Sequence, residues 1–177
     1  MLIDPTLASG SLISVAGTGT SDYRLSMTFV DDDTVIGAQG TAPFRVTDIS
    51  GSSGTLVASP ATAATSERFI AYTVLAGVPL FASVDSVSSA VRIYDASDLG
   101  SLQLLATVNN TSGTLAANGN GVGSVAWGPT FGDSAFLYAM SANQGIQAFV
   151  VTIPEPATTT LLLVGGGLLL GAKRRKA

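Results

Sequence analysis

Short runs of strand-forming residues, each bounded by turn-forming residues, restrict the fold of residues 1–153 more than any other feature of the sequence. The runs are rich in Val, Ile, Thr and aromatic residues, which favour the pleated backbone of a strand. Between them lie Gly, Ser, Asn and Asp, as in Gly51-Ser52-Ser53-Gly54 and Ala142-Asn143-Gln144-Gly145. No long stretch has the period of an amphipathic helix. These residues are therefore predicted to form an all-β body.

Eleven strands are predicted from these runs, and a weak internal repeat groups them. They cover residues 25–30, 34–38, 44–49, 55–58, 69–75, 80–84, 91–94, 102–108, 124–127, 135–140 and 146–151. In three successive groups the third strand begins at Phe44, Val91 and Ile146, and the first two share the pattern apolar-Arg-apolar-x-Asp. Four strands in a period of about 40 to 50 residues are typical of β-propeller blades. We therefore expect about three propeller-like blades, the last with three strands, and keep a β-sandwich as the alternative.

The start of the chain leads to a further expectation. Residues 1–5 have neither the basic residues nor the apolar run of a signal peptide, and three blades are too few to close a ring. We therefore expect the chain to be the C-terminal part of a longer protein, or to come from a gene model that starts late. Residues 1–22 are accordingly assigned to a truncated N-terminal segment, residues 23–153 to a β-rich repeat domain and residues 154–177 to a tail.

The composition of the chain excludes several kinds of chemistry. It contains no cysteine, so neither a disulfide nor a thiolate site can form, and no histidine, the commonest general base and metal ligand. Without histidine a Ser-His-Asp triad cannot be built. Residues 1–153 contain four arginines and eleven acidic residues, a net charge of −7 that argues against nucleic-acid binding. We therefore predict no catalytic residues, no metal site, no cofactor and no nucleic-acid partner.

Two groups of acidic residues have both a functional and a structural interpretation. Asp31-Asp32-Asp33 could belong to a calcium site, but no closing bidentate acid follows in register, so a hairpin turn is the preferred interpretation. Asp48 and Asp95 occupy equivalent places in the repeat, where they could form a ring of ligands. Repetition favours instead a structural role, in which each carboxylate binds backbone N–H groups of the following turn.

Two other features of the body are also interpreted as structural. Residues 119–123 are rich in Gly but lack the strand-to-helix context and the lysine of a phosphate-binding loop, so we predict a plain loop before the next strand. Trp127 could stack on a sugar, but a single Trp at the end of a strand more often belongs to the core.

The last 24 residues, 154–177, consist of three successive parts. The first is Pro154-Glu155-Pro156, which cannot continue a helix. The second is an uncharged span of 16 residues, 157–172, which would reach about 24 Å as a helix and so approach the thickness of the hydrocarbon layer of a membrane. The third is a basic cluster that would stop transfer and remain cytoplasmic. The predicted transmembrane residues are Leu161, Leu162, Leu163, Gly165, Gly166, Gly167, Leu168, Leu169 and Leu170, and the predicted stop-transfer residues are Lys173, Arg174, Arg175 and Lys176.

This tail resembles the PEP-CTERM sorting signal of Gram-negative bacteria. The matching parts are Pro-Glu-Pro-Ala-Thr at 154–158, the Leu- and Gly-rich span 161–171 and the basic cluster 173–176. The resemblance implies recognition by an exosortase, a membrane cysteine protease-transpeptidase that cuts near the Pro-Glu-Pro motif. It also implies a body on the periplasmic side of the inner membrane and a final place at the cell surface or in the extracellular matrix, with exopolysaccharide as a further partner. A buried core helix would need a polar stripe, which residues 161–170 lack, and a plain anchor would explain neither the Pro-Glu-Pro nor the glycines at 165–167.

The tail describes how the chain is routed, and three functions of the body are compatible with it. The preferred one is a non-enzymatic protein of the cell surface or matrix, tethered in the membrane and then processed through its tail. The alternative is the C-terminal part of an exported propeller enzyme, lactonase-like or hydrolase-like, whose catalytic residues lie outside this chain. A third is a tail-anchored protein that no enzyme processes.

Overall fold

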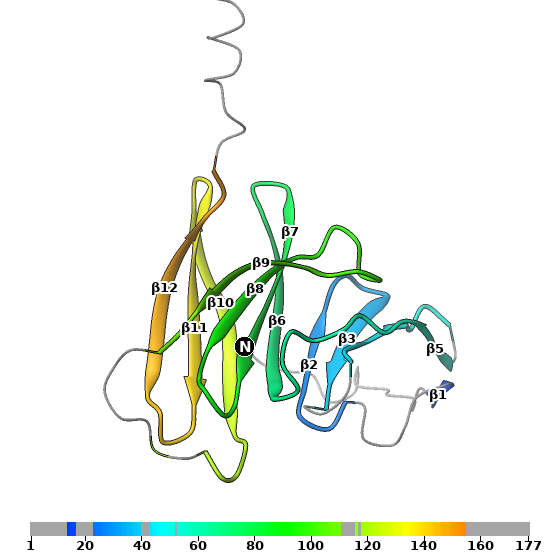
Figure 1. Ribbon diagram of the computed structural model, residues 1–177. Coiled ribbons are helices and arrows are strands. Elements are labelled where there is room, and N and C mark those ends of the chain that lie inside the picture. Colours follow the sequence, from blue (N-terminus) through cyan, green and yellow to red (C-terminus); the bar gives the residue numbers. More distant parts are fainter. Residues whose placement is uncertain are drawn as a thin grey trace, which may run out of the picture.

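The computed structural model describes residues 14–16, 23–39, 43–51, 53–110, 116 and 118–154, and within them the chain forms twelve strands and no helix (Figure 1). Each of the eleven predicted strands overlaps one of β2 to β12, so the prediction of an all-β body is confirmed. The strands are β1 (Ser14–Ala16), β2 (Ser26–Phe29), β3 (Thr34–Ala38), β4 (Arg45–Asp48), β5 (Ser53–Ala58), β6 (Glu67–Leu75), β7 (Val78–Asp85), β8 (Val91–Asp95), β9 (Gln103–Val108), β10 (Gly123–Phe131), β11 (Ser134–Ser141) and β12 (Ile146–Thr152).

The strands form three sheets, which follow the grouping expected from the repeat. The N-terminal sheet has the order β1-β5-β4-β3-β2, the middle sheet β6-β7-β8-β9 and the C-terminal sheet β10-β11-β12. From β2 onward, strands that are consecutive within a sheet pair antiparallel. The three aligned segments of the repeat are β4, β8 and β12, which are the third strands of the groups that begin at β2, β6 and β10. A sandwich has two sheets, whereas the described residues form three.

Strand β1 was not predicted, and it lies in the segment assigned to residues 1–22. It pairs in parallel with β5, with Ser14 opposite Ser53 and Ala16 opposite Thr55. A strand of three residues that pairs with a partner almost forty residues away produces little local pattern in the sequence. The N-terminal segment therefore contributes a strand to the sheet of the repeat domain.

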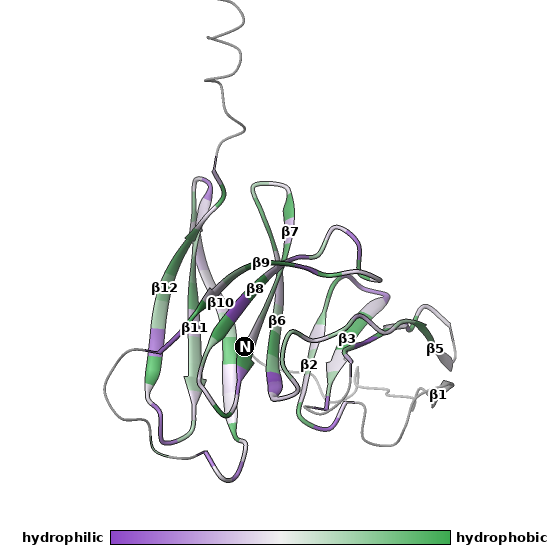
Figure 2. Ribbon diagram, in the orientation of Figure 1, coloured by the Kyte–Doolittle hydropathy of each residue, from purple (hydrophilic) through white to green (hydrophobic). Residues whose placement is uncertain are grey.

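The middle sheet lies between the other two and contributes to both hydrophobic cores (Figure 1). Successive side chains of a strand point to opposite faces, so the neighbours Leu80 and Phe81 of β7 enter different cores. Leu80 packs with Leu137 of the C-terminal sheet, and Phe81 packs with Phe44, which precedes β4. The rings of Phe44 and Phe81 meet edge to face, with centroids 4.9 Å apart. Hydrophobic residues run along the strands, whereas most hydrophilic residues gather near their ends and in the turns (Figure 2).

Strands β2, β6 and β10, which are the first strands of the three repeat groups, lie side by side with β6 in the centre. The backbone N–H groups of Ile70 and Tyr72 on β6 donate to the side-chain oxygens of Ser26 (3.2 Å) and Thr28 (3.1 Å) on β2. On the other side of β6, the indole Nε1 of Trp127 donates to the carbonyl oxygen of Ala71 at 3.3 Å. Strand β6 therefore joins the middle sheet to both of its neighbours.

Two structural interpretations made from the sequence agree with this fold. Trp127 is partly buried against the core between the middle and C-terminal sheets, as expected for a core residue. The Gly-rich stretch forms a loop in which Gly121 donates to the carbonyl oxygen of Asn118 (3.1 Å), and β10 begins at Gly123. Gly121 has a φ of +61°, a backbone conformation that suits glycine.

No helix in the described part of the chain is long and apolar enough to cross a membrane. The predicted transmembrane residues 161–170 and the predicted stop-transfer residues 173–176 lie outside the described residues. Both therefore stay predictions from the sequence.

Candidate functional site

The predicted sorting motif begins where the last strand ends. Strand β12 is held along its length by β11, with Thr152 opposite Ser134 and Val151 opposite Ala135. The ladder continues for one residue beyond the strand, because the N–H of Ile153 donates to the carbonyl oxygen of Asp133 at 2.9 Å. The side chain of Ile153 also packs against the core.

Pro154 follows Ile153 directly and is exposed to solvent. It has no N–H to donate, so the hydrogen-bonded ladder cannot extend through it. The other two residues of the predicted motif, Glu155 and Pro156, lie outside the described residues. The boundary between folded body and motif is therefore a single peptide bond, from Ile153 to Pro154.

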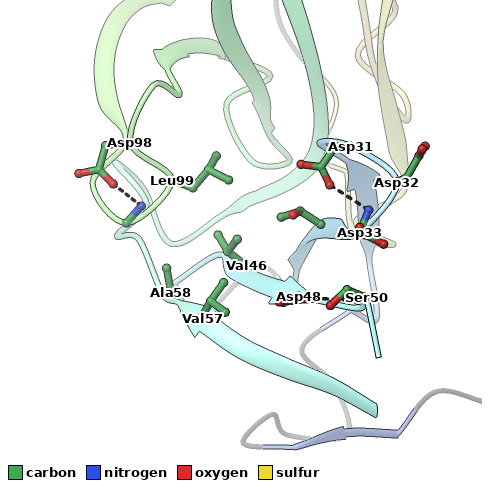
Figure 3. Close-up of a pocket in the computed structure, with 12 residues that line it drawn as sticks. Asp31, Asp32, Asp33, Val46, Asp48, Ser50, Val57, Ala58, Asp98 and Leu99 are labelled. Carbon is green, nitrogen blue, oxygen red and sulfur yellow. Dashed lines mark hydrogen bonds between the residues drawn. The ribbon is translucent and has the colours of Figure 1, made fainter. Parts of the chain in front are cut away.

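The body has a broad groove of about 830 Å³ between the N-terminal sheet and the loop after β8 (Figure 3). Its polar lining consists mainly of carboxylates, which lie on both sides of an apolar floor. The acidic residues of the lining are Asp31, Asp32, Asp33, Asp48 and Asp98, and the apolar residues are Val46, Val57, Ala58 and Leu99. The lining contains neither Lys nor Arg, so its charge disfavours phosphate and other anions.

Several of these carboxylates bind the backbone of their own turns. Asp31 accepts from the N–H of Asp33 at 2.9 Å, and Asp48 and Asp98 each accept from the residue two positions later at 2.8 Å (Figure 3). The backbone and side-chain hydrogen bonds from Ser50 lower the pKa of Asp48 below its ordinary value. These contacts agree with the interpretation of Asp31-Asp32-Asp33 as a turn and of Asp48 as a turn-capping residue.

Asp95, the repeat partner of Asp48, has the same role. It accepts from the N–H of Ser97 at 2.8 Å, and the hydrogen bonds from Ser97 lower its pKa. In the described part of the chain, no group of three or more His, Cys, Asp or Glu side chains is placed to hold a metal ion. The groove therefore has acidic walls whose carboxylates mainly shape its turns.

A buried carboxylate, Glu67, lies at the start of β6 and was not selected from the sequence. Only 1% of its surface is exposed. One oxygen accepts from the N–H of Ala64 at 2.7 Å, and the other accepts from the hydroxyl groups of Tyr94 (2.8 Å) and Ser83. Burial, the negative charge of Glu67 and their hydrogen bond all raise the pKa of the Tyr94 hydroxyl well above its ordinary value.

Arg92 connects Glu67 to a second carboxylate, Asp85. Its Nη1 lies 3.7 Å from Glu67 Oε1 and 3.5 Å from Asp85 Oδ2. Burial opposes ionisation of Asp85, but hydrogen bonds from Ser66 and from the N–H groups of residues 87 and 88 outweigh it, so the pKa of Asp85 is lowered. Both oxygens of Glu67 have partners and neither is open to solvent. The cluster therefore joins β6, β7 and β8 and is not a binding site.

A folded β body, followed at once by an exposed proline and then by an apolar and basic tail, defines the class of proteins that carry a C-terminal sorting signal. Residues 152–176 match the PEP-CTERM protein-sorting motif, so the chain carries this motif and the resemblance is confirmed. The match includes the last residue of β12 and Pro154, together with the predicted residues of the tail. It supports an exported protein that is sorted through its C-terminus, and it implies an exosortase as the processing partner.

No curated protein and no solved structure matches the chain. Apart from residues 152 and 153, the matched motif lies in the tail.

Proposed function

We propose that the protein is a non-enzymatic component of the bacterial cell surface or extracellular matrix, held in the inner membrane and then processed by an exosortase. The observation that carries this proposal is the PEP-CTERM motif at residues 152–176, which begins at Thr152, the last residue of β12. In this proposal residues 157–172 span the membrane, the basic cluster 173–176 stays cytoplasmic and the body is periplasmic before sorting. Exopolysaccharide is the proposed surrounding of the mature protein.

Two features of the body support a role without catalysis. The whole sequence contains neither histidine nor cysteine, the side chains most often used for acid-base and nucleophilic chemistry. Three carboxylates of the groove, those of Asp31, Asp48 and Asp98, bind the turns on which they lie, and Glu67 is buried within the middle sheet.

We also propose that the three sheets are successive blades of a propeller. The support is the central position of β6, which is hydrogen-bonded through side chains to β2 on one side and to β10 on the other. The equivalent third strands β4, β8 and β12 give the same grouping from the sequence repeat.

The geometry at Ile153 supports processing at Pro154 or beyond. A protease binds its substrate as an extended chain, and residues up to Ile153 are already paired with β11 or with the turn before it. Cleavage before Pro154 would require β12 to detach from its sheet. The mature protein should therefore end at Pro154 or later.

The test is the intact mass of the protein recovered from its parent bacterium, with and without the exosortase gene. We expect a shortened form that ends at Pro154 or beyond, and its loss in the deletion strain. Glu155→Gln should accumulate the full-length chain, whereas Asp32→Asn, which changes an exposed carboxylate of the body, should be processed normally. A C-terminus of Lys176-Ala177 in both strains would reduce the tail to a membrane anchor.

A further inference from the structure

The outer face of the C-terminal sheet is apolar and exposed. The inner face, which includes Leu137, packs against the middle sheet, so the even-numbered side chains of β11, β12 and the first part of β10 point outward. After the register shift between Trp127 and Thr130 the alternation in β10 reverses, and Phe131 points outward beside Phe136. None of these outward residues is charged in β10, β11 or β12. The exposed fractions are 41% for Tyr138, 74% for Ile146 and 57% for Val150. An uncharged face of this kind on an exported protein indicates an interaction surface.

A shallow hollow of about 190 Å³ lies on this face beside the first strand of the sheet. Its lining includes Ala126 of β10, Tyr138 and Met140 of β11 and Ile146 of β12. Ala126 has a small side chain, so a bulky side chain from outside can approach the β10 backbone there.

The N-terminal sheet, which lies at the opposite end of the stack of three sheets, also exposes large hydrophobic side chains. Met27 and Phe29 of β2 are 52% and 55% exposed. Thr28, which lies between them, faces the middle sheet and accepts a hydrogen bond from β6. Met27 and Phe29 therefore point away from the middle sheet.

These two surfaces are equivalent to surfaces that already meet inside the chain. The first strands share a four-residue pattern, in which the second and fourth side chains face the preceding sheet and the third, a small one, faces the following sheet. The three copies are Ser26-Met27-Thr28-Phe29, Phe69-Ile70-Ala71-Tyr72 and Ser124-Val125-Ala126-Trp127. Twice within the molecule the fourth residue of one copy meets the third residue of the copy before it: Tyr72 N–H bonds to Thr28, and Trp127 bonds to Ala71.

Among the described residues, the pattern leaves one fourth position and one third position without a neighbouring sheet. Phe29 is the exposed fourth residue at the start of the stack, and Ala126 is the exposed third residue at its end. In the interior of the molecule, residues at these two positions of the pattern lie against each other. Phe29 and Ala126 occupy the same two positions but are exposed. The side chains in the pattern on both exposed surfaces are uncharged, so their contact would bury no unpaired charge.

We propose that the outer face of the C-terminal sheet binds a second copy of this chain, head to tail, with Phe29 of that copy packed against Ala126. The contact repeats, between chains, the packing that joins the sheets within a chain. It is a heterologous interface, which closes into a ring if the rotation permits. Two copies bring together six of the described sheets, and closed propellers typically contain about four to eight. The expected assembly is therefore a closed dimer.

The absence of cysteine in the chain allows a direct cross-linking test with the full-length protein in mild detergent. Two singly substituted proteins, Phe29→Cys and Ala126→Cys, are purified separately and mixed under oxidising conditions. A disulfide needs Cα atoms about 4.4 to 6.8 Å apart, so the mixture should form a cross-linked dimer several-fold faster than the control mixture. The control replaces Ala126→Cys by Val87→Cys, which is 71% exposed but lies in the turn between β7 and β8. Equal cross-linking in both mixtures overturns the proposal.

A second measurement separates this interface from association through the apolar tail. Ile146→Glu places a charge on the outer face at a position that is largely exposed, so the chain should keep its circular dichroism spectrum. Sedimentation velocity should give the mass of two chains for the unsubstituted protein and of one chain for the variant. A monomeric unsubstituted protein, which is the outcome if a different protein or further sheets of a longer chain cover this face, overturns the proposal. So does a dimer that survives Ile146→Glu, because the tail would then hold it together.

Discussion

The middle and C-terminal sheets are built from similar strands but differ in how many of their faces are covered. Over its first three strands, β6 to β8, both faces of the middle sheet are largely buried, one against each neighbouring sheet, and these strands enclose the Glu67 cluster, whereas the edge strand β9 is exposed. The C-terminal sheet is covered on one face, and its other face exposes Tyr138, Ile146 and Val150. Similar apolar strand patterns can therefore serve two purposes. In the middle sheet they stabilise the fold, and in the C-terminal sheet they leave a surface available for a partner.

The largest expected loss of stability comes from a substitution that creates a cavity in the core beside the middle sheet. Phe81 is fully buried and contacts Phe44 edge to face, so Phe81→Ala should lower the free energy of unfolding by about 3 to 5 kcal/mol. Phe136 belongs to the outer face of the C-terminal sheet and is only partly buried, so Phe136→Ala should cost clearly less. Urea denaturation followed by tryptophan fluorescence gives both values. Equal losses would mean that the two sheets contribute to the core in the same way.

An intermediate effect is expected from Tyr94→Phe, which removes the hydroxyl bonded to Glu67. A hydrogen bond to a charged group contributes about 1.5 to 3 kcal/mol, and the variant should lose a similar amount at neutral pH. The folded-state pKa of Tyr94 is raised above the unfolded value of about 10. The stability linked to this proton is therefore complete below about pH 10 and is lost as the pH rises further.

The alkaline loss of stability should consequently be smaller in Tyr94→Phe than in the unsubstituted protein. Urea midpoints measured between about pH 9 and 11 test this difference. Burial also raises the pKa of Tyr72, so some alkaline loss should remain in the variant. Parallel pH profiles for the two proteins would show that Tyr94 is not the group responsible.

The smallest effect is expected on the exposed face. Val150→Thr keeps the shape of a side chain that is 57% exposed, and it should change the free energy of unfolding by less than about 0.5 kcal/mol. The same substitution at Val91, which is fully buried in the middle sheet, places a hydroxyl in the core and should cost about 1 to 3 kcal/mol. Thermal unfolding at low protein concentration compares the two variants. A large loss at Val150 would show that its face is already covered.

The strands could be predicted because their signals are local. Thr34–Ala38 was predicted with the same bounds as β3, since acidic turn residues precede it and a break follows it. Strand β10 was predicted to end at Trp127, because Gly128 and Pro129 interrupt the pattern. It runs to Phe131 because a register shift between Trp127 and Thr130 lets the ladder continue beyond them.

The Glu67 cluster could not be predicted, because its members are far apart in the sequence. Ser83 and Tyr94 are 16 and 27 residues from Glu67, and only the pairing of β6, β7 and β8 brings them together. The sorting motif is the opposite case. Its signal is the order of residues in one continuous stretch, so the sequence was sufficient to identify it.

The direct junction between Ile153 and Pro154 determines how the body would respond to a pulling force. In the proposed state the protein is attached through its C-terminal tail. A force that pulls on the body would therefore act first at Ile153, where the body joins the tail. Among the described strands β12 has a single neighbour, β11, and their pairs begin at Thr152 and Ser134. Force applied at that end would peel the strand from its sheet one pair at a time, before the inner strand β6 carries any load. The C-terminal sheet is thus the part of the molecule that tension would open first.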